Sequence, residues 1–395
     1  MNKGSLQEYY PYVILAPSSL LNLRGVEHWI LEVTSRIKGI TIITFFKDLH
    51  YDVRDLDELS KRLAVVRTWF AGRNVRWYEL RVLSYENMWK KVPEPVIKFI
   101  KSRGLVIPLS SKLLMLRGKI VYIVCGDPFQ AILLALIAII VGARKIILGF
   151  HARPSYKVFT CVKPIFTILS KLKILKGIHT VNIVDALTLR KILIRIPIWW
   201  VPNGVDCRRF KPSTKRSDKF QVLFVGAVSE DKGADTFVEI AKIVKNTFND
   251  VEFVIVSAGG SLRRLIEDAH NQGIVHYLGF IPDALLPKLY AESHITVFPS
   301  REEAFGLVSL EAQASGTPVI TTDLPAFRQS VINGVTGILI KPYTPQAFVD
   351  AIIKMRDIWL NDRLRYMQMC RAARENAEKY CWERVVRIYY KKFFK

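Results

Sequence analysis

The run of residues 297–321, VFPSREEAFGLVSLEAQASGTPVIT, constrains the fold of this chain more than any other stretch. It begins in a short apolar strand predicted over 294–298 and continues into a Pro-Ser turn. Apolar residues then recur at helical spacing from 307 to 314. Gly316 ends the helix, because glycine adopts the left-handed cap conformation without penalty, and 318–320 opens a second buried strand. Strand, helix and strand in succession predict a parallel βαβ unit.

Two glutamates flank the start of the predicted helix, Glu303 in the loop before it and Glu311 inside it. A helix N-terminus exposes unpaired N–H groups and a partial positive charge, so it can hold a phosphate. Gly306 lets the backbone approach a ligand there. Carboxylates on both sides of a phosphate suit a nucleotide sugar, which carries hydroxyls on its sugar and on its ribose. From these residues alone, a buried βαβ unit with solvated glutamates is an equal alternative.

Strands and helices alternate along most of the chain, which is typical of an α/β protein with doubly wound parallel sheets. At 395 residues it is long enough for two domains. We predict a first domain over 1–206, a linker over 207–219, a second domain over 220–362 and a helical tail over 363–395 that returns to the first domain. Predicted strands lie at 12–16, 40–46, 65–70, 77–83, 119–125, 145–150, 221–225, 251–257 and 275–278. Predicted helices lie at 26–36, 55–63, 129–141, 235–248, 262–270 and 285–291.

The positive charge is concentrated in the first half. Of the net charge of +23, residues 101–200 contribute +14, from 16 Lys and Arg against 2 Asp and Glu. Such an excess favours an anionic partner, which could be a phospholipid surface, a lipid-phosphate acceptor or nucleic acid. Residues 154–177 intersperse lysines with bulky apolar residues, which suits an anionic membrane surface or an ordinary helix with a solvated basic face.

The cysteines and the apolar runs indicate in which cellular compartment the protein is expected. Five scattered cysteines without a Cys-x-x-Cys pair argue against a disulfide framework or zinc site and favour a reducing environment. No run near the N-terminus is long enough for a signal peptide. The longest uncharged stretch, 128–143, has sixteen residues and predicts a buried helix rather than a membrane span. We therefore expect a cytoplasmic protein, peripheral on the inner membrane face.

The stretch PSREEAFGLVSLEAQASGTPVI, with Glu303 and Glu311, resembles the two-glutamate signature of retaining, family-4-like glycosyltransferases of the GT-B fold (glycosyl transferases group 1). Residues 202–206, PNGVD, are similar to that family's domain junction, and 280–290 to its nucleobase loop. Arg24 and Gly25 resemble the start of its acceptor-facing Gly-Gly-x-Glu loop, with arginine in place of the first glycine. The resemblance implies two Rossmann-like domains that face each other across a cleft.

The resemblance also implies roles for individual residues. Glu303 would position the donor sugar, Glu311 would accept hydrogen bonds from the ribose, and Lys232 would bind the diphosphate. The implied catalytic residues are Glu303, His151 and Lys232; the donor-binding residues are Gly226, Lys232, Ser300, Phe305, Gly306, Leu307 and Glu311; the acceptor-side residues are Arg24 and Gly25. Ala227 departs from the family's pattern, because it occupies the place of a second diphosphate-binding basic residue, an arginine. A lone histidine at a strand end, such as His151, is otherwise more often structural.

The implied activity is the transfer of a hexose, with retention, from a UDP- or GDP-linked donor to a lipid-linked or glycan acceptor. Basic side chains and helix dipoles stabilise the leaving diphosphate in GT-B enzymes, so neither a metal nor a cofactor is implied, and we treat the Asp55-x-Asp57 spacing as chance. Two alternatives stay open. Ala227 suggests a catalytically impaired GT-B partner subunit, and the charge alone suggests a nucleic-acid-binding protein. No nucleic-acid-binding motif is present, so we expect no such partner.

Overall fold

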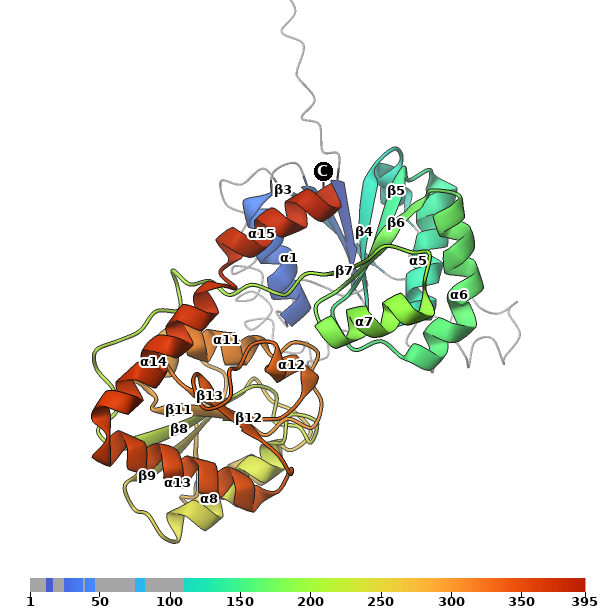
Figure 1. Ribbon diagram of the computed structural model, residues 1–395. Helices are drawn as coiled ribbons and strands as arrows, with labels where there is room; N and C mark the ends of the chain where they lie inside the picture. The colour runs from blue at the N-terminus through green and yellow to red at the C-terminus, as the bar shows by residue number, and fades with distance from the viewer. Residues whose placement is uncertain (1–11, 17–24, 38–39, 47–74, 82–109, 395) are drawn as a thin grey trace, which may run out of the picture. The chain divides into compact units, whose positions relative to one another are not determined.

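The computed structural model describes residues 12–16, 25–37, 40–46, 75–81 and 110–394 (Figure 1). Its contacts divide the chain into two compact units, one formed by 1–201 with 386–395 and the other by 202–385. The helix predicted at 55–63 and the strand predicted at 65–70 lie outside the described residues.

The first unit contains a seven-stranded parallel sheet in the order β3-β2-β1-β4-β5-β6-β7. Its strands are β1 (Tyr12–Ala16), β2 (Ile40–Phe46), β3 (Val75–Arg81), β4 (Ile120–Cys125), β5 (Lys145–Phe150), β6 (Leu175–Thr180) and β7 (Ile198–Trp200). Every residue of β4 is buried, as expected of a parallel strand that is covered on both faces.

Helices cover both faces of this sheet (Figure 1). The helices α5 (Pro128–Val141), α6 (Tyr156–Lys171) and α7 (Ile183–Ile192) pack on the face to which Val121 and Ile123 point. The opposite face carries α1 (Gly25–Arg36), where Trp29 stacks on Tyr122 at 5.0 Å between ring centroids, and the end of α15 (Trp382–Tyr389). A 3₁₀ helix, η2 (Ser111–Leu116), precedes β4, and a π-helix, η3 (Tyr390–Phe394), follows α15.

The second unit contains a six-stranded parallel sheet in the order β10-β9-β8-β11-β12-β13. Its strands are β8 (Phe220–Val225), β9 (Val251–Val256), β10 (His276–Tyr277), β11 (Ile295–Phe298), β12 (Val319–Thr322) and β13 (Gly337–Ile340). Its helices are α8 (Ala234–Lys245), α9 (Arg263–Asn271), α10 (Leu286–Glu292), α11 (Leu307–Ala314), α12 (Pro325–Arg328), α13 (Pro345–Asn361) and α14 (Arg363–Glu378). Phe237 of α8 and Phe348 of α13 join the core on one face, and α11 packs against α14.

The direction in which strands are added reverses between β1 and β4 in the first sheet and between β8 and β11 in the second. Ligands of open parallel sheets bind beyond the carboxyl ends of the strands at such a point. The two-domain α/β prediction is confirmed, and the loops after β8 and β11 are the place to look for a site.

Several predicted boundaries differ from the structure. The first unit ends at 201 rather than 206, and the segment 363–395 is not one helix that belongs to the first unit. Its first helix, α14, packs on α11, and only 386–395 belong to the first unit, because the apolar face of α14 is buried in the second core. Residues 154–177 are also not a single segment, since α6 ends at Lys171 and β6 begins at Leu175.

Cys207 and Cys381 form a disulfide, with their Cα atoms 5.6 Å apart. The expectation of no disulfide was therefore wrong. The two cysteines are 174 residues apart in the sequence and are brought together by local pairing, in which Val205 N–H donates to Tyr380 O and Trp382 N–H donates to Val205 O. Such a pairing cannot be seen in cysteine spacing, and the cysteines no longer support a reducing compartment.

The uncharged stretch 128–143 forms α5, which is buried along one face and leaves Ile140 exposed at its end. Throughout the described ranges, no helix is long and apolar enough to cross a membrane.

Candidate functional site

Two loops meet beyond the carboxyl ends of β8 and β11, the adjacent strands at which the second sheet reverses its order. The backbone N–H of Arg301 donates to Asp231 O at 2.8 Å, and its guanidinium makes two hydrogen bonds to Asp235, at 2.8 and 2.6 Å. Gly233 has φ +71°, and a Cβ there would lie 1.8 Å from Pro299 O. Only glycine permits this approach, so loops 226–233 and 299–306 are in direct contact, and we call the region where they meet the crevice.

Lys232 and Glu303 form an ion pair across this crevice, with 2.9 Å between Lys232 Nζ and Glu303 Oε2. The second oxygen of Glu303 accepts the N–H of Ala304 at 3.1 Å. Both side chains keep contact with solvent, at 31% and 15% of their full exposure. A ligand phosphate can therefore compete with Glu303 for the ammonium group of Lys232.

The N-terminus of α11 opens into the same loop. Gly306 precedes the helix with φ +81°, and a Cβ there would lie 2.6 Å from the ring of Phe327. No side chain caps α11 and its first turn carries no acidic side chain, so the positive end of the helix dipole is available to an anion. At the end of β8, an added Cβ on Gly226 would meet nothing closer than Phe224 at 3.9 Å. The crevice thus offers a lysine, a helix N-terminus and open space beside the backbone.

Glu311 occupies a half-buried position farther along α11. Burial raises the pKa of its carboxyl to about 7, against the opposing effect of Arg209, while Asp283 adds to the increase. The buried Tyr290 donates its hydroxyl to Glu311 Oε2 at 3.1 Å. Arg209 is itself paired with Asp283 at 2.6 Å. Glu311 can therefore accept a proton or a ligand hydroxyl near neutral pH.

In the first unit, His151 directly follows β5 and begins a chain of hydrogen bonds. Its Nε2 lies 3.0 Å from the hydroxyl of Tyr122, which lies 2.5 Å from His179 Nδ1. His179 Nε2 lies 2.8 Å from Val201 O, and a carbonyl can only accept. His179 must then donate from Nε2, so Tyr122 donates to His179 Nδ1 and His151 Nε2–H donates to Tyr122. This order leaves Nδ1 of His151 as a lone-pair acceptor.

The charge state of the two histidines agrees with this order. Burial lowers the pKa of His179 to about 4 and lowers the pKa of His151 well below its usual range. Both rings are therefore neutral at pH 7. In the described part of the chain, Nδ1 of His151 is buried and has no hydrogen-bond partner. Because a buried acceptor without a donor is costly, a ligand hydroxyl is a suitable partner for it.

The other predicted site residues fall into three groups. Ser300 and Phe305 are buried in the wall of the crevice, Leu307 is half-buried, and Ala227 is exposed. Gly25 opens α1, and Arg24 lies outside the described residues. The roles of all these residues stay predictions. The sequence did not single out Arg209 and Tyr290, which lie around Glu311 in the second unit, or Tyr122 and His179, which are linked to His151 in the first. Tyr122 carries one usable signal, since it interrupts an otherwise apolar and fully buried strand.

The fold and the crevice define a GT-B protein of two Rossmann-like units, as the sequence predicted. Residues 208–380 match the family of glycosyl transferases, group 1. The matched part is less than half of the chain and contains Lys232, Glu303 and Glu311.

Among known proteins, a D-inositol 3-phosphate glycosyltransferase of Paenarthrobacter aurescens is 32% identical over 206 residues, which cover 47% of this chain and 49% of the relative. The chain thus spans about half the length of the curated relatives that it matches. The structure of HepE from Anabaena, in complex with UDP and glucose, has a TM-score of 0.69 at 14% identity, covering 96% of this chain and 98% of that one. Sucrose-phosphate synthase from Thermosynechococcus elongatus has a TM-score of 0.64 at 16% identity, covering 97% and 99%. These structures establish the shared fold.

Proposed function

We propose that this protein is a retaining, metal-independent hexosyltransferase that uses a UDP- or GDP-linked sugar donor. The observation that carries the proposal is the ion pair of Lys232 and Glu303 beside the N-terminus of α11, at the reversal point of the second sheet. The family match of 208–380 supports it, and so do the UDP complexes of HepE, a protein of the same fold.

In this proposal the donor diphosphate replaces Glu303 as the partner of Lys232 and accepts hydrogen bonds from the first turn of α11. Glu303 is then released to accept hydrogen bonds from the sugar hydroxyls. As the glycosidic bond breaks, Lys232 and the helix N-terminus stabilise the charge that develops on the diphosphate. The departing diphosphate stays beside the sugar and takes the proton of the acceptor hydroxyl. His151 accepts a hydrogen bond from a sugar hydroxyl through its unpartnered Nδ1.

Donor binding should depend on pH through Glu311. Ribose hydroxyls donate to its ionised carboxylate, so binding lowers a pKa that is about 7 in the free protein and releases a proton. Affinity for the UDP- or GDP-sugar should therefore rise with pH up to about 7 and fall up to about tenfold per pH unit below it. Calorimetric titration with a panel of UDP- and GDP-sugars between pH 5 and 8 measures both donor choice and this slope.

The Glu311→Gln variant should bind the donor more weakly and lose the slope. Glu239→Gln, on an exposed site of α8, is the matched control and should leave the slope unchanged. If no nucleotide sugar binds at any pH, the proposed activity is wrong. A product with inverted anomeric configuration, read by NMR, would reject retention alone.

A catalytically impaired partner subunit is the second candidate, because Ala227 provides no second basic group for the diphosphate and is exposed. The guanidinium of Arg301 cannot take this role as it stands, since Asp235 holds it. This candidate predicts donor binding without transfer or hydrolysis, whereas the enzyme turns the donor over.

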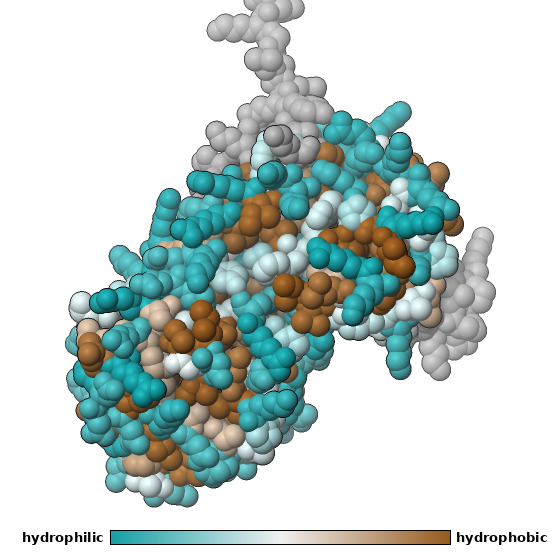
Figure 2. Space-filling view, in the orientation of Figure 1, coloured by the Kyte–Doolittle hydropathy of each residue, from teal (hydrophilic) through white to brown (hydrophobic). Residues whose placement is uncertain are grey.

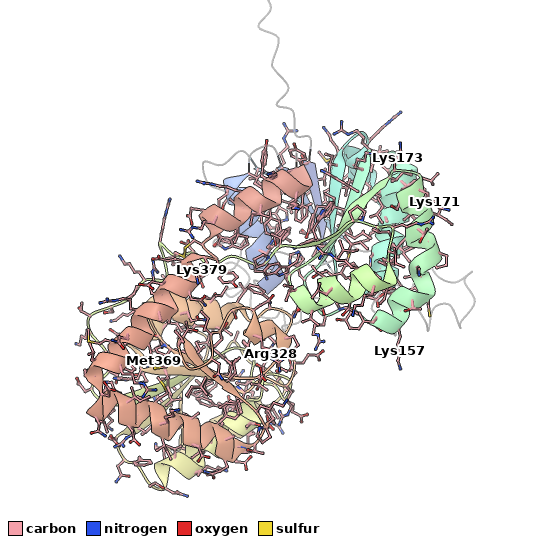
Figure 3. All side chains as sticks on the ribbon, viewed as in Figure 1. Lys157, Lys171, Lys173, Arg328, Met369 and Lys379 are labelled. Carbon is pink, nitrogen blue, oxygen red and sulfur yellow. A yellow bond between two sulfur atoms is a disulfide. The ribbon has the colours of Figure 1, made fainter. Side chains whose placement is uncertain are left out.

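We further propose a lipid-linked or glycan acceptor reached at an anionic membrane surface. Ile165 and Ile168 of α6 and Leu172, which directly follows the helix, lie at spacings of three and four residues outside the buried face and are all exposed. Figure 3 shows Lys157 at one end of α6 and Lys171 at the other. Figure 2 shows hydrophobic and hydrophilic side chains interspersed on the visible face of this unit. Such a surface can combine apolar insertion with attraction to anionic lipid. The name of the Paenarthrobacter relative makes an inositol phosphate a further acceptor to screen.

Charge reversal on α6 should weaken membrane binding. Each basic residue near an anionic bilayer contributes about 1 kcal/mol, so Lys157→Glu, Lys163→Glu and Lys171→Glu together should lower liposome affinity at least about tenfold. Sedimentation with phosphatidylglycerol vesicles at low and high salt measures the change. The control reverses three exposed lysines of the second unit, Lys242, Lys354 and Lys379. Wild-type protein that ignores these vesicles at low salt would point to a soluble acceptor instead.

A further inference from the structure

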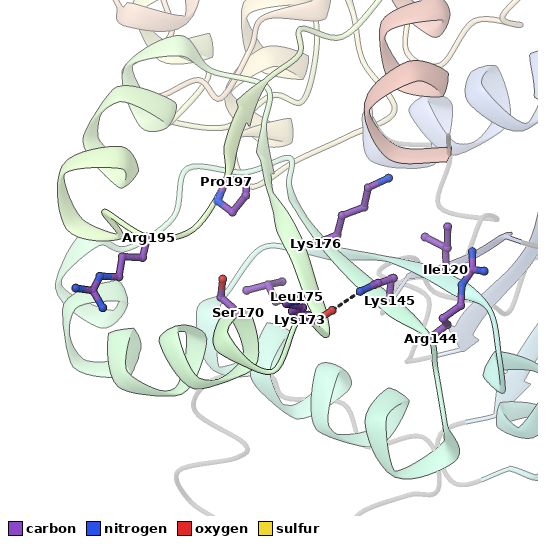
Figure 4. Close-up of a pocket in the computed structure, with 9 residues that line it drawn as sticks. All are labelled: Ile120, Arg144, Lys145, Ser170, Lys173, Leu175, Lys176, Arg195 and Pro197. Atoms are coloured by element: carbon purple, nitrogen blue, oxygen red, sulfur yellow. Dashed lines mark hydrogen bonds between the residues drawn. The ribbon is translucent and has the colours of Figure 1, made fainter.

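A basic pocket lies at the opposite edge of the first sheet from His151. It has a volume of about 520 Å³ and is lined by Ile120, Arg144, Lys145, Ser170, Lys173, Leu175, Lys176, Arg195 and Pro197 (Figure 4). Ile120, Lys145 and Leu175 are the first residues of β4, β5 and β6, whereas His151 follows the last residue of β5. The six residues of β5 therefore separate the pocket from His151 by about 20 Å. The proposed sugar transfer makes no use of it.

Five cationic side chains line this pocket, and none of its described lining residues is acidic. Backbone carbonyls take one hydrogen bond from each of two of them: Lys145 Nζ donates to Lys173 O at 2.5 Å and Lys176 Nζ donates to Phe393 O at 3.4 Å. An ammonium group has three donors, so both lysines keep further capacity. Across the described ranges, no carboxylate pairs with any of the five cations.

Acidic residues are scarce in the part of the sequence that supplies the pocket. Residues 101–200 contain only two acids, Asp127 and Asp185. Asp127 caps α5 at the other edge of the sheet by accepting from Phe129 N at 2.8 Å. Asp185 accepts the hydroxyl of Tyr156. Burial, followed by the charges of Arg144 and Lys145, lowers the pKa of Lys176, as expected where cations repel one another without a counter-ion.

We propose that this pocket is a second anion site, which binds the phosphate group of a ligand that is not the sugar donor. Five cations around one cavity suit a group with two or more negative charges, because each added charge relieves repulsion among the side chains. Leu172 and Ile194 are exposed next to Lys173 and Arg195 in the sequence, so both a soluble phosphate and the headgroup of an anionic lipid fit this chemistry.

The test uses the full chain and the double variant Arg144→Gln, Arg195→Gln. Both arginines are exposed and lie outside α6, so the substitutions should leave the fold and the membrane-facing stripe of α6 intact. Lys242→Gln with Lys354→Gln is the control, since it removes the same charge at exposed residues of the second unit that do not line the pocket. Calorimetry with inorganic pyrophosphate tests a soluble ligand, and flotation with phosphatidylglycerol against phosphatidylcholine vesicles tests a lipid source.

We expect the pocket variant to lose at least tenfold in affinity for pyrophosphate, for phosphatidylglycerol vesicles or for both, while the control variant keeps wild-type affinity. Loss for pyrophosphate alone identifies a soluble ligand, and loss for vesicles alone identifies a lipid headgroup. Pyrophosphate can also bind in the donor crevice, so the Lys232→Ala variant is titrated in parallel. This variant should lose pyrophosphate binding at the crevice and keep pyrophosphate binding at the basic pocket. The proposal is overturned if the pocket and control variants bind both probes equally. Nucleotide-sugar binding should survive in the pocket variant, so failure of either proposal is recognised separately.

Discussion

Replacing Lys232 by alanine should lower kcat/KM by about 100- to 1,000-fold, the usual cost of one group that stabilises charge in a transition state. Lys232 is the basic side chain that the structure places in the crevice against Glu303, 2.9 Å away. In the family that this chain resembles, a second basic residue shares the diphosphate, but here Ala227 stands in its place. We therefore expect the loss to fall at the high end of the range. Steady-state kinetics with the donor identified by calorimetry measures it.

Two further variants show whether the loss of kcat/KM arises because Lys232 no longer binds the donor diphosphate. Ala227→Arg should recover part of the loss when combined with Lys232→Ala, because it restores a positive charge near the end of β8. Lys242→Ala, at an exposed site of α8, removes the same charge elsewhere and should leave kcat/KM unchanged. A Lys232→Ala variant with wild-type kinetics would mean that the diphosphate is bound at another place.

Glu303→Gln should lower kcat by about 100-fold or more, with a small change in KM, because this side chain is proposed to position the sugar for reaction. The glutamine keeps the shape of the side chain and one acceptor oxygen, so the loop should retain its conformation. Loss of the negative charge frees Lys232 for the diphosphate, which should hold donor affinity constant or raise it. Kinetics and calorimetry on the same preparation separate these effects.

Glu302→Gln provides a matched control for this variant. Glu302 is the exposed neighbour of Glu303 in the same loop, and its side chain has no assigned role. We expect its kcat to be that of the wild type. If Glu303→Gln raises KM and spares kcat, Glu303 is a binding residue and its catalytic assignment fails.

The sequence by itself determined the local elements and the identity of the crevice. The apolar strand at 295–298, the helix at 307–314 and the glycine before it follow from short-range patterns, and the structure has all three. Glu303 and Lys232 were each singled out by their own motif, in loops that follow predicted strands. The carboxyl ends of parallel strands share one edge, and the structure makes β8 and β11 neighbours, so these two loops lie close together.

Only the tertiary structure decided which side chains become partners. Glu311 has a raised pKa because the surrounding packing desolvates its carboxyl, against the opposing effects of Arg209 and of the hydrogen bond from Tyr290, and no spacing in the sequence reports that environment. The chain from His151 through Tyr122 to His179 joins three strands or strand ends, and the basic pocket joins residues from 120 to 197. The disulfide joins cysteines 174 residues apart. Periodicity and turn chemistry act over a few residues, whereas burial, hydrogen bonding and charge clustering depend on packing between segments that are distant in the chain.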